Sequence, residues 1–421
     1  MSREEIEQVE KELDEVLEIV QRPVPVKNTG REETVSLQEN LQENDPLQEE
    51  MQIETEKEEK EEKEDSPESA AKEQTAVSEE ELDLEDDIEN GYFHFLRPSD
   101  GLIAAFFVPV AVLIILFAQR GIFPFGEECF LRTDMYHQYA PFFSEFQYKL
   151  KQGGSLLYSW DIGMGVNFSA LYAYYLASPV NWLIILCPKK FIIEFMTILI
   201  MVKTGLCGVT FTWYLDHHFE KKHFVAGVFG IFYALSGYMA AYSWNIMWLD
   251  CIFLLPLILY GLEQLVQEKK GLFYCVTLGL SILSNYYISI MICIFMVMYV
   301  IVQVILYPPK KIKDLVATGV RFGFYSLLAG GLAAVVLLPE VYALQATASG
   351  DFDFPKTISC YFSIFDMIAR HIGNVGTEIG LDHWPNIYCG VAVLMFLLLY
   401  LGAKKITVRE KAVSCGLLLM F

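Results

Sequence analysis

The sequence lacks the patterns that mark several common classes of protein. It has no basic tract of the kind that binds nucleic acid, so we expect no nucleic-acid partner. Its nine cysteines form no CxxC pair or other metal-type spacing, which argues against a structural zinc site. Most of the cysteines lie in apolar runs, where we expect buried, reduced thiols. Cys129 and Cys360 are the one plausible pair outside these runs. The chain opens on acidic, polar residues, so we also expect no cleavable signal peptide.

Acidic charge is concentrated at the N-terminus. Residues 1–96 hold 33 of the 53 Asp and Glu residues but only 9 of the 31 Lys and Arg residues, so the remainder of the chain is close to neutral. The Glu/Gln/Lys-rich stretch 28–90 cannot bury a core, and we expect an acidic, mostly disordered arm over 1–96 that lies in the cytoplasm. A short helix at 4–20 could dock a cytoplasmic partner, although its length favours a marginal helix within the arm.

Long apolar runs dominate the rest of the chain, and about 20 such residues suffice to cross a bilayer. We therefore predict an all-α, polytopic transmembrane helix bundle over 97–421. The expected apolar segments are 101–118, 168–187, 191–215, 224–242, 249–266, 272–284, 287–306, 316–338, 387–403 and 412–421. Two long loops interrupt them, at 120–167 and 340–386. The last segment stops within an apolar run, so we expect the membrane domain to be truncated at its C-terminal end.

Lysine-rich connections predict which loops face the cytoplasm. They lie at 221–223, 268–270, 310–313 and 404–411. All four connections and the N-terminus can lie on the cytoplasmic side if one of the apolar runs does not cross the membrane. We expect that run to be 168–187, which contains Pro179 and Asn181, and interpret it as a re-entrant or interfacial segment. The alternative is that 168–187 crosses the membrane, which would place the loops that follow it on the opposite sides. The first interpretation puts both long loops on the outer face.

The stretch that follows Thr133 places a carboxylate beside aromatic and imidazole side chains at the mouth of the first span. A carboxylate is a suitable general base for a hydroxyl that attacks a sugar carbon, so Asp134 is the candidate catalytic residue. Tyr136 and His137 could position it or bind a diphosphate. The alternative is that Asp134 caps a short loop helix beginning near Met135, and the sequence favours the two interpretations equally.

Further polar and aromatic residues lie in the outer loops or at expected outer span ends, and are candidates for substrate binding. They are Trp160, Asp161, Asn167, Asn245, Asp250, Asn285 and Tyr286. Aromatic faces suit sugar rings, and carboxylate and amide groups can hold hydroxyls. A helix cap is the alternative role for Asn245 and Asp250, and an interfacial aromatic belt is the alternative for Trp160. The pair Gly163 and Gly165 follows no strand, so we reject a nucleotide-binding loop there.

Two basic residues are candidates for binding phosphate. Lys203 lies near the middle of the run 191–215, where a charge is costly and needs an anionic partner. That partner could be the phosphate of a lipid-linked substrate, whereas Glu194 or a backbone carbonyl are the structural alternatives. Arg370 lies in the loop 340–386, whose bases could hold a pyrophosphate. The histidines at 217, 218 and 223 have no supporting cysteine pattern, and we predict no metal site there.

Several motifs, in one order, resemble the bacterial YfhO membrane-protein family. They are Asp134-Met-Tyr-His-Gln-Tyr-Ala-Pro-Phe-Phe, Gly154-Ser-Leu-Leu-Tyr-Ser, Gly163-Met-Gly-Val-Asn-Phe, Tyr174-Tyr-Leu-Ala-Ser-Pro-Val-Asn, Leu255-Pro-Leu-Ile, Asn285-Tyr-Tyr and Pro385-Asn-Ile-Tyr-Cys-Gly. That family is similar to the GT-C glycosyltransferases, multi-span enzymes that use polyprenyl-phosphate sugars. The resemblance implies a bundle of GT-C type with an acidic residue in its first outer loop, which maps onto Asp134.

The resemblance also implies a function at the plasma membrane of a Gram-positive bacterium. A sugar would move from an undecaprenyl-phosphate carrier to an envelope polymer, such as teichoic or lipoteichoic acid. Membrane lipid, the lipid-linked donor and the polymer would be the partners; no cofactor is implied, and metal dependence stays open. The arm 1–96 lies outside the family pattern. Two other classes remain open: a transporter or flippase of lipid-linked sugars, weakened by the lack of an inverted repeat, and a non-catalytic scaffold.

Overall fold

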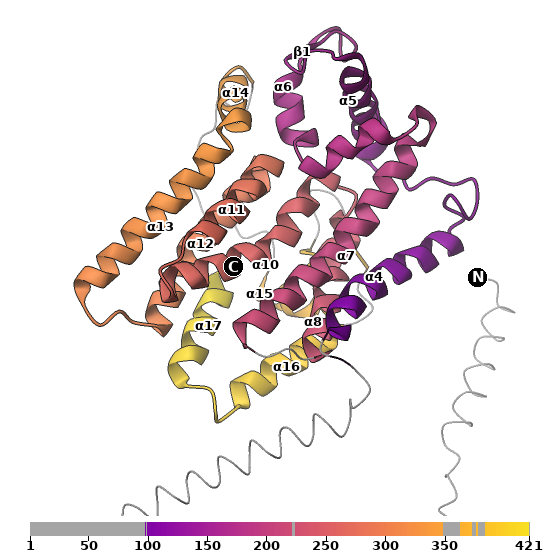
Figure 1. The fold of residues 1–421 in the computed structure, drawn as a ribbon. Helices are drawn as coiled ribbons and strands as arrows, with labels where there is room; N and C mark the ends of the chain where they lie inside the picture. Colours follow the sequence, from indigo (N-terminus) through magenta and orange to yellow (C-terminus); the bar gives the residue numbers. More distant parts are fainter. Residues whose placement is uncertain are drawn as a thin grey trace, which may run out of the picture. The chain divides into compact units, whose positions relative to one another are not determined.

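A computed structural model describes residues 97, 99–220, 224–347, 363–372, 376–377 and 384–420. The predicted arm and its short helix lie outside the described residues, as does Cys360, the expected partner of the exposed Cys129. Helices make up almost all the regular structure of the described part (Figure 1), which confirms the predicted all-α class. The one sheet found there is a hairpin of two short strands, β1 (Tyr158–Ser159) and β2 (Val166–Asn167).

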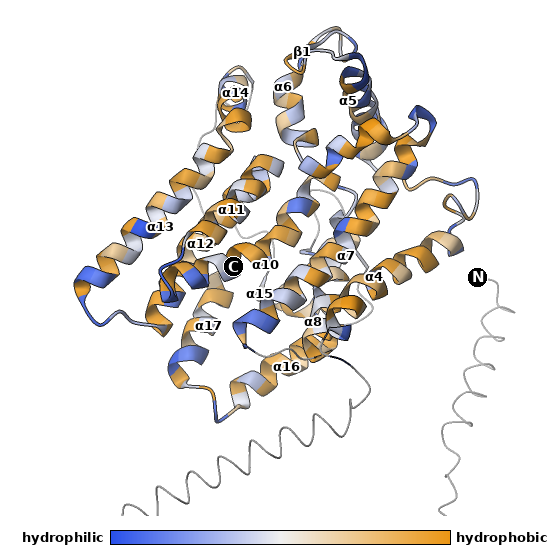
Figure 2. Ribbon diagram, viewed as in Figure 1, coloured by the Kyte–Doolittle hydropathy of each residue, from blue (hydrophilic) through white to orange (hydrophobic). Residues whose placement is uncertain are grey.

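Six helical segments in the described part are long and apolar enough to cross a membrane. They are α4 (Asp100–Gln119), η4 with α7 (Lys189–Phe191 and Ile192–His218), α8 with α9 (Phe224–Ala234 and Gly237–Tyr242), α10 (Ile246–Gln267), α12 (Tyr286–Leu306) and α13 (Ile312–Leu332). Shorter helices accompany them: α11 (Leu272–Ser284), α14 (Ala334–Gln345), α16 (Val391–Gly402) and α17 (Val408–Met420). Figure 2 shows that apolar residues cover most of their length. Length and composition thus agree with the predicted polytopic bundle.

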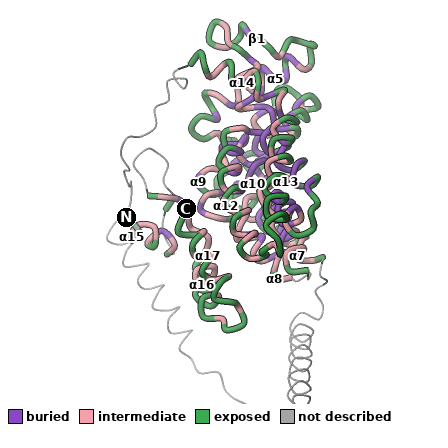
Figure 3. The backbone as a smooth tube through the Cα atoms, turned by 90° about the vertical axis from the view of Figure 1, so that its left-hand side faces the viewer, coloured by how far each residue is buried: buried purple, intermediate pink, exposed green. Residues whose placement is uncertain are grey.

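The centre of the bundle is formed by α7 and α10. In an apolar 18-residue stretch of each helix, about 56% of the residues are buried in α7 and 61% in α10, against 22% in α4 and 11% in α13. The first two are therefore interior helices, and the other two are peripheral. Figure 3 shows the same concentration of buried residues around α10. Because a polar group on an interior helix is shielded from solvent and lipid, charges on α7 and α10 need partners within the protein.

Glycines allow α4, α7 and α8 to approach one another closely. A Cβ atom built on Gly208 of α7 would overlap the backbone carbonyl of Ala105 on α4, and one on Gly227 of α8 would overlap the backbone of Gly101. Small residues at such positions are typical of helix pairs in membranes, where packing replaces the hydrophobic effect as the source of association.

We expect Gly208→Ala to lower the stability of the protein by about 1–3 kcal/mol, because the added methyl group overpacks the interface with α4. Gly330→Ala on α13 is the matched control, since nothing lies within 4 Å of a Cβ built there. That change should be neutral, or stabilising by up to about 1 kcal/mol through helix propensity. Thermal unfolding of the two purified variants in detergent measures the difference, and equal effects would contradict the packing argument.

The segment predicted to be re-entrant is strongly bent. It forms α6 (Phe168–Leu171), η2 (Tyr172–Leu176) and η3 (Pro179–Leu186), and the two halves meet at 102°. Ser178, just before Pro179, has an extended backbone, as expected for a residue that precedes proline. A re-entrant loop and a broken span both have this shape, so the sidedness of the segment stays a prediction.

Both long loops are more regular than the sequence indicated. The loop 120–167 contains η1 (Met135–Tyr139), α5 (Ala140–Gln152) and the β-hairpin. The expected loop 340–386 is wrong at its start, because α14 continues to Gln345. The expected run 316–338 is also divided, between α13 and α14, near Ala333. Hydropathy falls at polar residues, whereas a helix continues through them as long as its backbone groups stay paired.

Lysine-bearing connections gather at one end of the bundle. The connection between α12 and α13 and the one between α16 and α17 lie at the bottom of Figure 1, whereas α5, α6 and β1 lie at the top. These two connections therefore lie at the same end of the bundle, as expected for them, while which side of the membrane they face stays a prediction.

Candidate functional site

Six aromatic side chains form a continuous cluster at the end of the bundle that carries η1 and η2. The members of this aromatic cluster are Tyr139, Tyr174, Tyr175, Trp244, Trp248 and Tyr287. Tyr139 lies 5.5 Å from Tyr175 and 6.1 Å from Trp244, measured between ring centroids. Tyr174 lies 4.7 Å from Tyr175 and 6.2 Å from Tyr287, whose ring stacks on Trp248 at 6.3 Å. Four segments distant in sequence therefore meet here.

Asp134 lies at the start of η1, beside this cluster. Its side chain is exposed and makes no capping hydrogen bond, so the capping role that the sequence allowed is not used. Within η1, Met135 and Tyr139 are buried, whereas Tyr136 and His137 stay exposed, with their rings 5.2 Å apart. The short helix thus anchors itself through one face and leaves Asp134 with its two predicted neighbours accessible.

Tyr139 connects η1 to the start of α10. Its buried hydroxyl donates a 2.7 Å hydrogen bond to Oδ1 of Asn245. Burial raises the pKa of the Tyr139 hydroxyl far above its usual value, and the charges of Tyr175 and Asp134 raise it further. Two consequences follow. Tyr139 remains a hydrogen-bond donor at physiological pH, and the carboxylate of Asp134 lies close enough to act on the cluster electrostatically.

We expect Tyr139→Phe to destabilise the protein by about 1–3 kcal/mol, because it leaves a buried acceptor on Asn245 unpaired. Tyr136→Phe is the matched control: it removes the same atom from a side chain on the same helix that is 66% exposed. Thermal unfolding in detergent separates the two variants. A Tyr139 variant as stable as the Tyr136 variant would show that this hydrogen bond does not hold η1 against α10.

Two buried donors near Tyr139 lack a partner. Nδ2 of Asn245 and Nε1 of Trp244 are both buried and make no hydrogen bond in the described part of the chain. Buried polar groups are paired in most folded proteins, and each unpaired one costs free energy. A ligand with hydroxyl oxygens would satisfy such donors. Asn245 was predicted as a substrate-binding residue; its unpaired amide is compatible with that role, which stays a prediction.

Asn285 is a structural residue. Its side chain caps α12, because Oδ1 accepts from the backbone N–H of Ile288 at 3.0 Å. Its Nδ2 donates to the backbone carbonyl of Tyr174, also at 3.0 Å, and the residue is fully buried. The predicted substrate-binding role is therefore corrected to that of a clamp that holds η2 against α12.

Tyr286 adjoins the aromatic cluster and reaches a carboxylate that was not among the predicted site residues. Its hydroxyl donates a 2.6 Å hydrogen bond to Oε1 of Glu340, and its ring lies 5.9 Å from that of Tyr174. Burial raises the pKa of Glu340, and the hydrogen bond from Tyr286 partly opposes the shift. Oε2 of Glu340 is buried and makes no hydrogen bond to any described residue. Glu340 is thus a second acidic group beside the cluster.

Lys203 and Asp250 form a buried ion pair between α7 and α10. Lys203 is fully buried and also donates to the carbonyl of Ile246 at 3.2 Å, while Asp250 accepts from the hydroxyl of Ser178 at 2.7 Å. The sequence assigned Lys203 to phosphate and Asp250 to substrate. In the structure the two side chains instead pair with each other, which corrects the two assignments. The pair fixes the bent segment, through Ser178, onto the central helices.

Arg370 is likewise used by the protein itself. Its buried guanidinium donates to the carbonyl of Pro385 at 3.0 Å and to Oδ1 of Asn386 at 2.9 Å. Asn386 in turn donates to the hydroxyl of Tyr242, whose ring lies 6.2 Å from Trp248. The expected phosphate-binding role is therefore corrected to a structural one. Arg370 holds the chain before α16 against the end of α9.

Three further candidates lie on or beside the β-hairpin, which packs against α6. Trp160 is 76% exposed and contacts Tyr158, and Asp161 is exposed as well. Asn167 caps α6 by accepting from the backbone N–H of Ala170 at 3.3 Å. The cap gives Asn167 a structural function, whereas Trp160 and Asp161 stay available at the surface.

The remaining polar clusters hold no recognisable metal site. His218 pairs with Glu263 at 2.9 Å, and His217 contacts the backbone carbonyl of Trp213 at 2.7 Å, while the third histidine, at 223, lies outside the described residues. Across the described residues no three His, Cys, Asp or Glu side chains come together in a way that could hold a metal ion.

Comparisons with known proteins agree with this picture of the membrane body. The family described as "Bacterial membrane protein YfhO" matches residues 104–421, which is most of the chain. No curated protein and no solved structure matches it. The apolar helices and the family match together make this a multi-pass membrane protein. The chain belongs to the YfhO family of bacterial membrane proteins.

Proposed function

We propose that this protein is a GT-C-like glycosyltransferase. It transfers a sugar from a polyprenyl-phosphate carrier to a cell-envelope polymer, such as teichoic or lipoteichoic acid, on the extracytoplasmic face of the plasma membrane, with its N-terminus in the cytoplasm. The observation that carries the proposal is the exposed carboxylate of Asp134, free of any capping bond, beside a cluster of aromatic rings with unpaired donors.

The residues of the site fit the steps of such a transfer. The acceptor hydroxyl oxygen forms a bond to the anomeric carbon, and the bond from that carbon to the carrier's phosphate oxygen breaks, with its electrons leaving on the lipid phosphate. The proton of the acceptor passes to the carboxylate of Asp134, a contribution of about 10²–10⁴-fold for a well-placed base. Tyr136 and His137 flank that carboxylate, and the free donors of Asn245 and Trp244 suit sugar hydroxyls.

The hairpin offers a place for the acceptor polymer. Trp160 and Asp161 are exposed there, and an aromatic face next to a carboxylate suits a sugar or polyol chain. Asn167 sets the position of the hairpin by capping α6. These three residues therefore belong to acceptor recognition in this proposal, apart from the reacting groups at Asp134.

A transporter or flippase of lipid-linked sugars is the second candidate. Two observations favour it: the 102° bend in the segment 168–186 and the buried pair of Lys203 with Asp250. Broken helices and buried charges recur at the binding sites of transporters. In this protein, however, the two charges are bound to each other and to neighbouring groups, which is the arrangement of a structural support.

The experiment that tests the proposal compares bacteria that lack this protein with the same cells carrying the full-length gene. Wall and lipoteichoic acids are purified from both, and their sugars are identified and quantified. The proposal predicts that one sugar substituent is absent from a polymer without the protein and returns with it. Identical polymers in the two strains would remove envelope polymers as the acceptor.

A further inference from the structure

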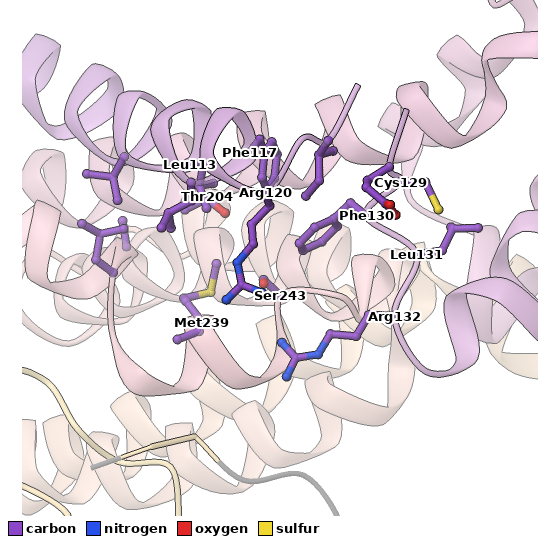
Figure 4. A pocket seen from close by; sticks show the side chains of 17 residues that line it. Leu113, Phe117, Arg120, Cys129, Phe130, Leu131, Arg132, Thr204, Met239 and Ser243 are labelled. Carbon is purple, nitrogen blue, oxygen red and sulfur yellow. The ribbon is translucent and has the colours of Figure 1, made fainter. Parts of the chain in front are cut away.

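A cavity of about 950 Å³ is lined by residues of α4 and of the helices that pack near it. It is bounded by α4, by the segment that follows α4 as far as Arg132, and by the helices α8 and α9 (Figure 4). Two residues of the lining are close in sequence to the candidate site. Arg132 stands two residues before Asp134, and Ser243 two residues before Asn245. The lining thus includes residues that are close in sequence to those to which we assign sugar transfer.

One part of this cavity is apolar. Leu113, Leu116 and Phe117 of α4 contribute apolar side chains to its lining, as do Leu235 and Met239. Only 22% of the span window of α4 is buried, so this helix lies at the periphery of the bundle, where a membrane protein meets lipid. A long apolar chain from the surrounding bilayer would thus find a matching surface here.

The other part is positively charged. The side chains of Arg120 and Arg132 extend toward the same space in Figure 4. Both residues are exposed, and neither takes part in an ion pair or side-chain hydrogen bond within the described chain. Glu128 supplies the one carboxylate of the lining, so the charged groups sum to a positive balance. Arg120 at the end of α4 also complements the helix dipole, whereas Arg132 has no such structural purpose.

We propose that this cavity binds the phosphate head of a membrane lipid, with the first part of the lipid's apolar chain along α4. Two unpaired guanidinium groups can hold a phosphate through bidentate, charge-assisted hydrogen bonds, and the apolar wall excludes a fully hydrophilic anion as the preferred ligand. That the bound lipid is the sugar carrier rests on the proposed function, but the binding of a lipid phosphate does not.

Binding is tested on the full-length protein in detergent, with farnesyl phosphate as the probe and native mass spectrometry as the readout. Arg120→Gln and Arg132→Gln should each weaken binding by about tenfold or more, as expected for the loss of a charge-assisted hydrogen bond. Arg97→Gln is the matched control, because this exposed arginine precedes the opposite end of α4. Thermal unfolding of each variant verifies that it is folded.

Farnesol and inorganic phosphate separate the possible ligands. Tight binding of farnesyl phosphate, weak binding of both reference compounds and sensitivity to the two arginines support a lipid-phosphate site. If inorganic phosphate binds as tightly as farnesyl phosphate, the cavity is a site for a free anion. If farnesol binds as tightly, the cavity recognises only the apolar chain. Either result overturns the proposal. The proposal is also overturned if both arginine variants bind farnesyl phosphate with unchanged affinity. Because no transfer is measured, failure here is distinguishable from failure of the glycosyltransferase proposal.

Discussion

Asp134→Asn is expected to reduce the rate of sugar transfer by about 10²–10⁴-fold, because the amide keeps the shape of the side chain but cannot accept the proton of the acceptor hydroxyl. The side chain is exposed and makes no capping hydrogen bond, so its replacement should leave the fold intact. Equal falls in kcat and kcat/KM, with unchanged stability, would identify Asp134 as a group that acts in the transition state.

The matched control for this variant is Glu127→Gln, which neutralises another exposed carboxylate of the same loop. It should retain the wild-type rate. The measurement is the initial rate of sugar incorporation into polymer, at equal amounts of membrane-inserted protein. If Asp134→Asn and Glu127→Gln transfer sugar equally fast, Asp134 is not the base.

Lys203→Met is expected to destabilise the protein by about 3–5 kcal/mol, since it leaves the carboxylate of Asp250 buried without its cation. The double variant Lys203→Met with Asp250→Asn should recover much of that loss, because no uncompensated charge remains and the amide oxygen can still accept from Ser178. The two single changes and the double change form a cycle that isolates the energy of the pair.

Thermal unfolding in detergent measures this cycle. Lys190→Met is the control, because this lysine is exposed near the start of the same helical segment and should tolerate the loss of its charge. A double variant no more stable than Lys203→Met would show that the pair is not a mutual compensation of charges. In that case Lys203 would have to meet another anion, as the sequence first indicated.

The sequence predicted the frame of this fold well, because hydropathy and proline report on local structure. The apolar run at 101–118 corresponds to α4, and the bend near Pro179 was expected from that proline within a tyrosine-rich run. The extension of α14 through Glu340 was missed, since a polar residue lowers hydropathy without ending a helix.

Long-range pairing was beyond the reach of the sequence. Lys203 was expected to need an anion, but Asp250 lies 47 residues away, on another helix. Tyr139 and Asn245, which join η1 to α10, are 106 residues apart. Asn285 was expected to bind substrate, whereas it caps α12, and this role depends on backbone geometry. Periodicity within one element carries no information about which elements meet, so such pairs appear only in three dimensions.

A glycosyltransferase must transfer the sugar itself, without a second enzyme. The most direct test uses the purified full-length protein in detergent micelles, supplied with a polyprenyl-phosphate sugar labelled in the sugar and with teichoic acid polymer. Micelles enclose no compartment, so a flippase has nothing to transport and forms no product. We predict labelled polymer in the micelles. Absence of labelled polymer there, together with movement of the labelled lipid across the membrane of sealed vesicles, would contradict the account and establish the transporter in its place.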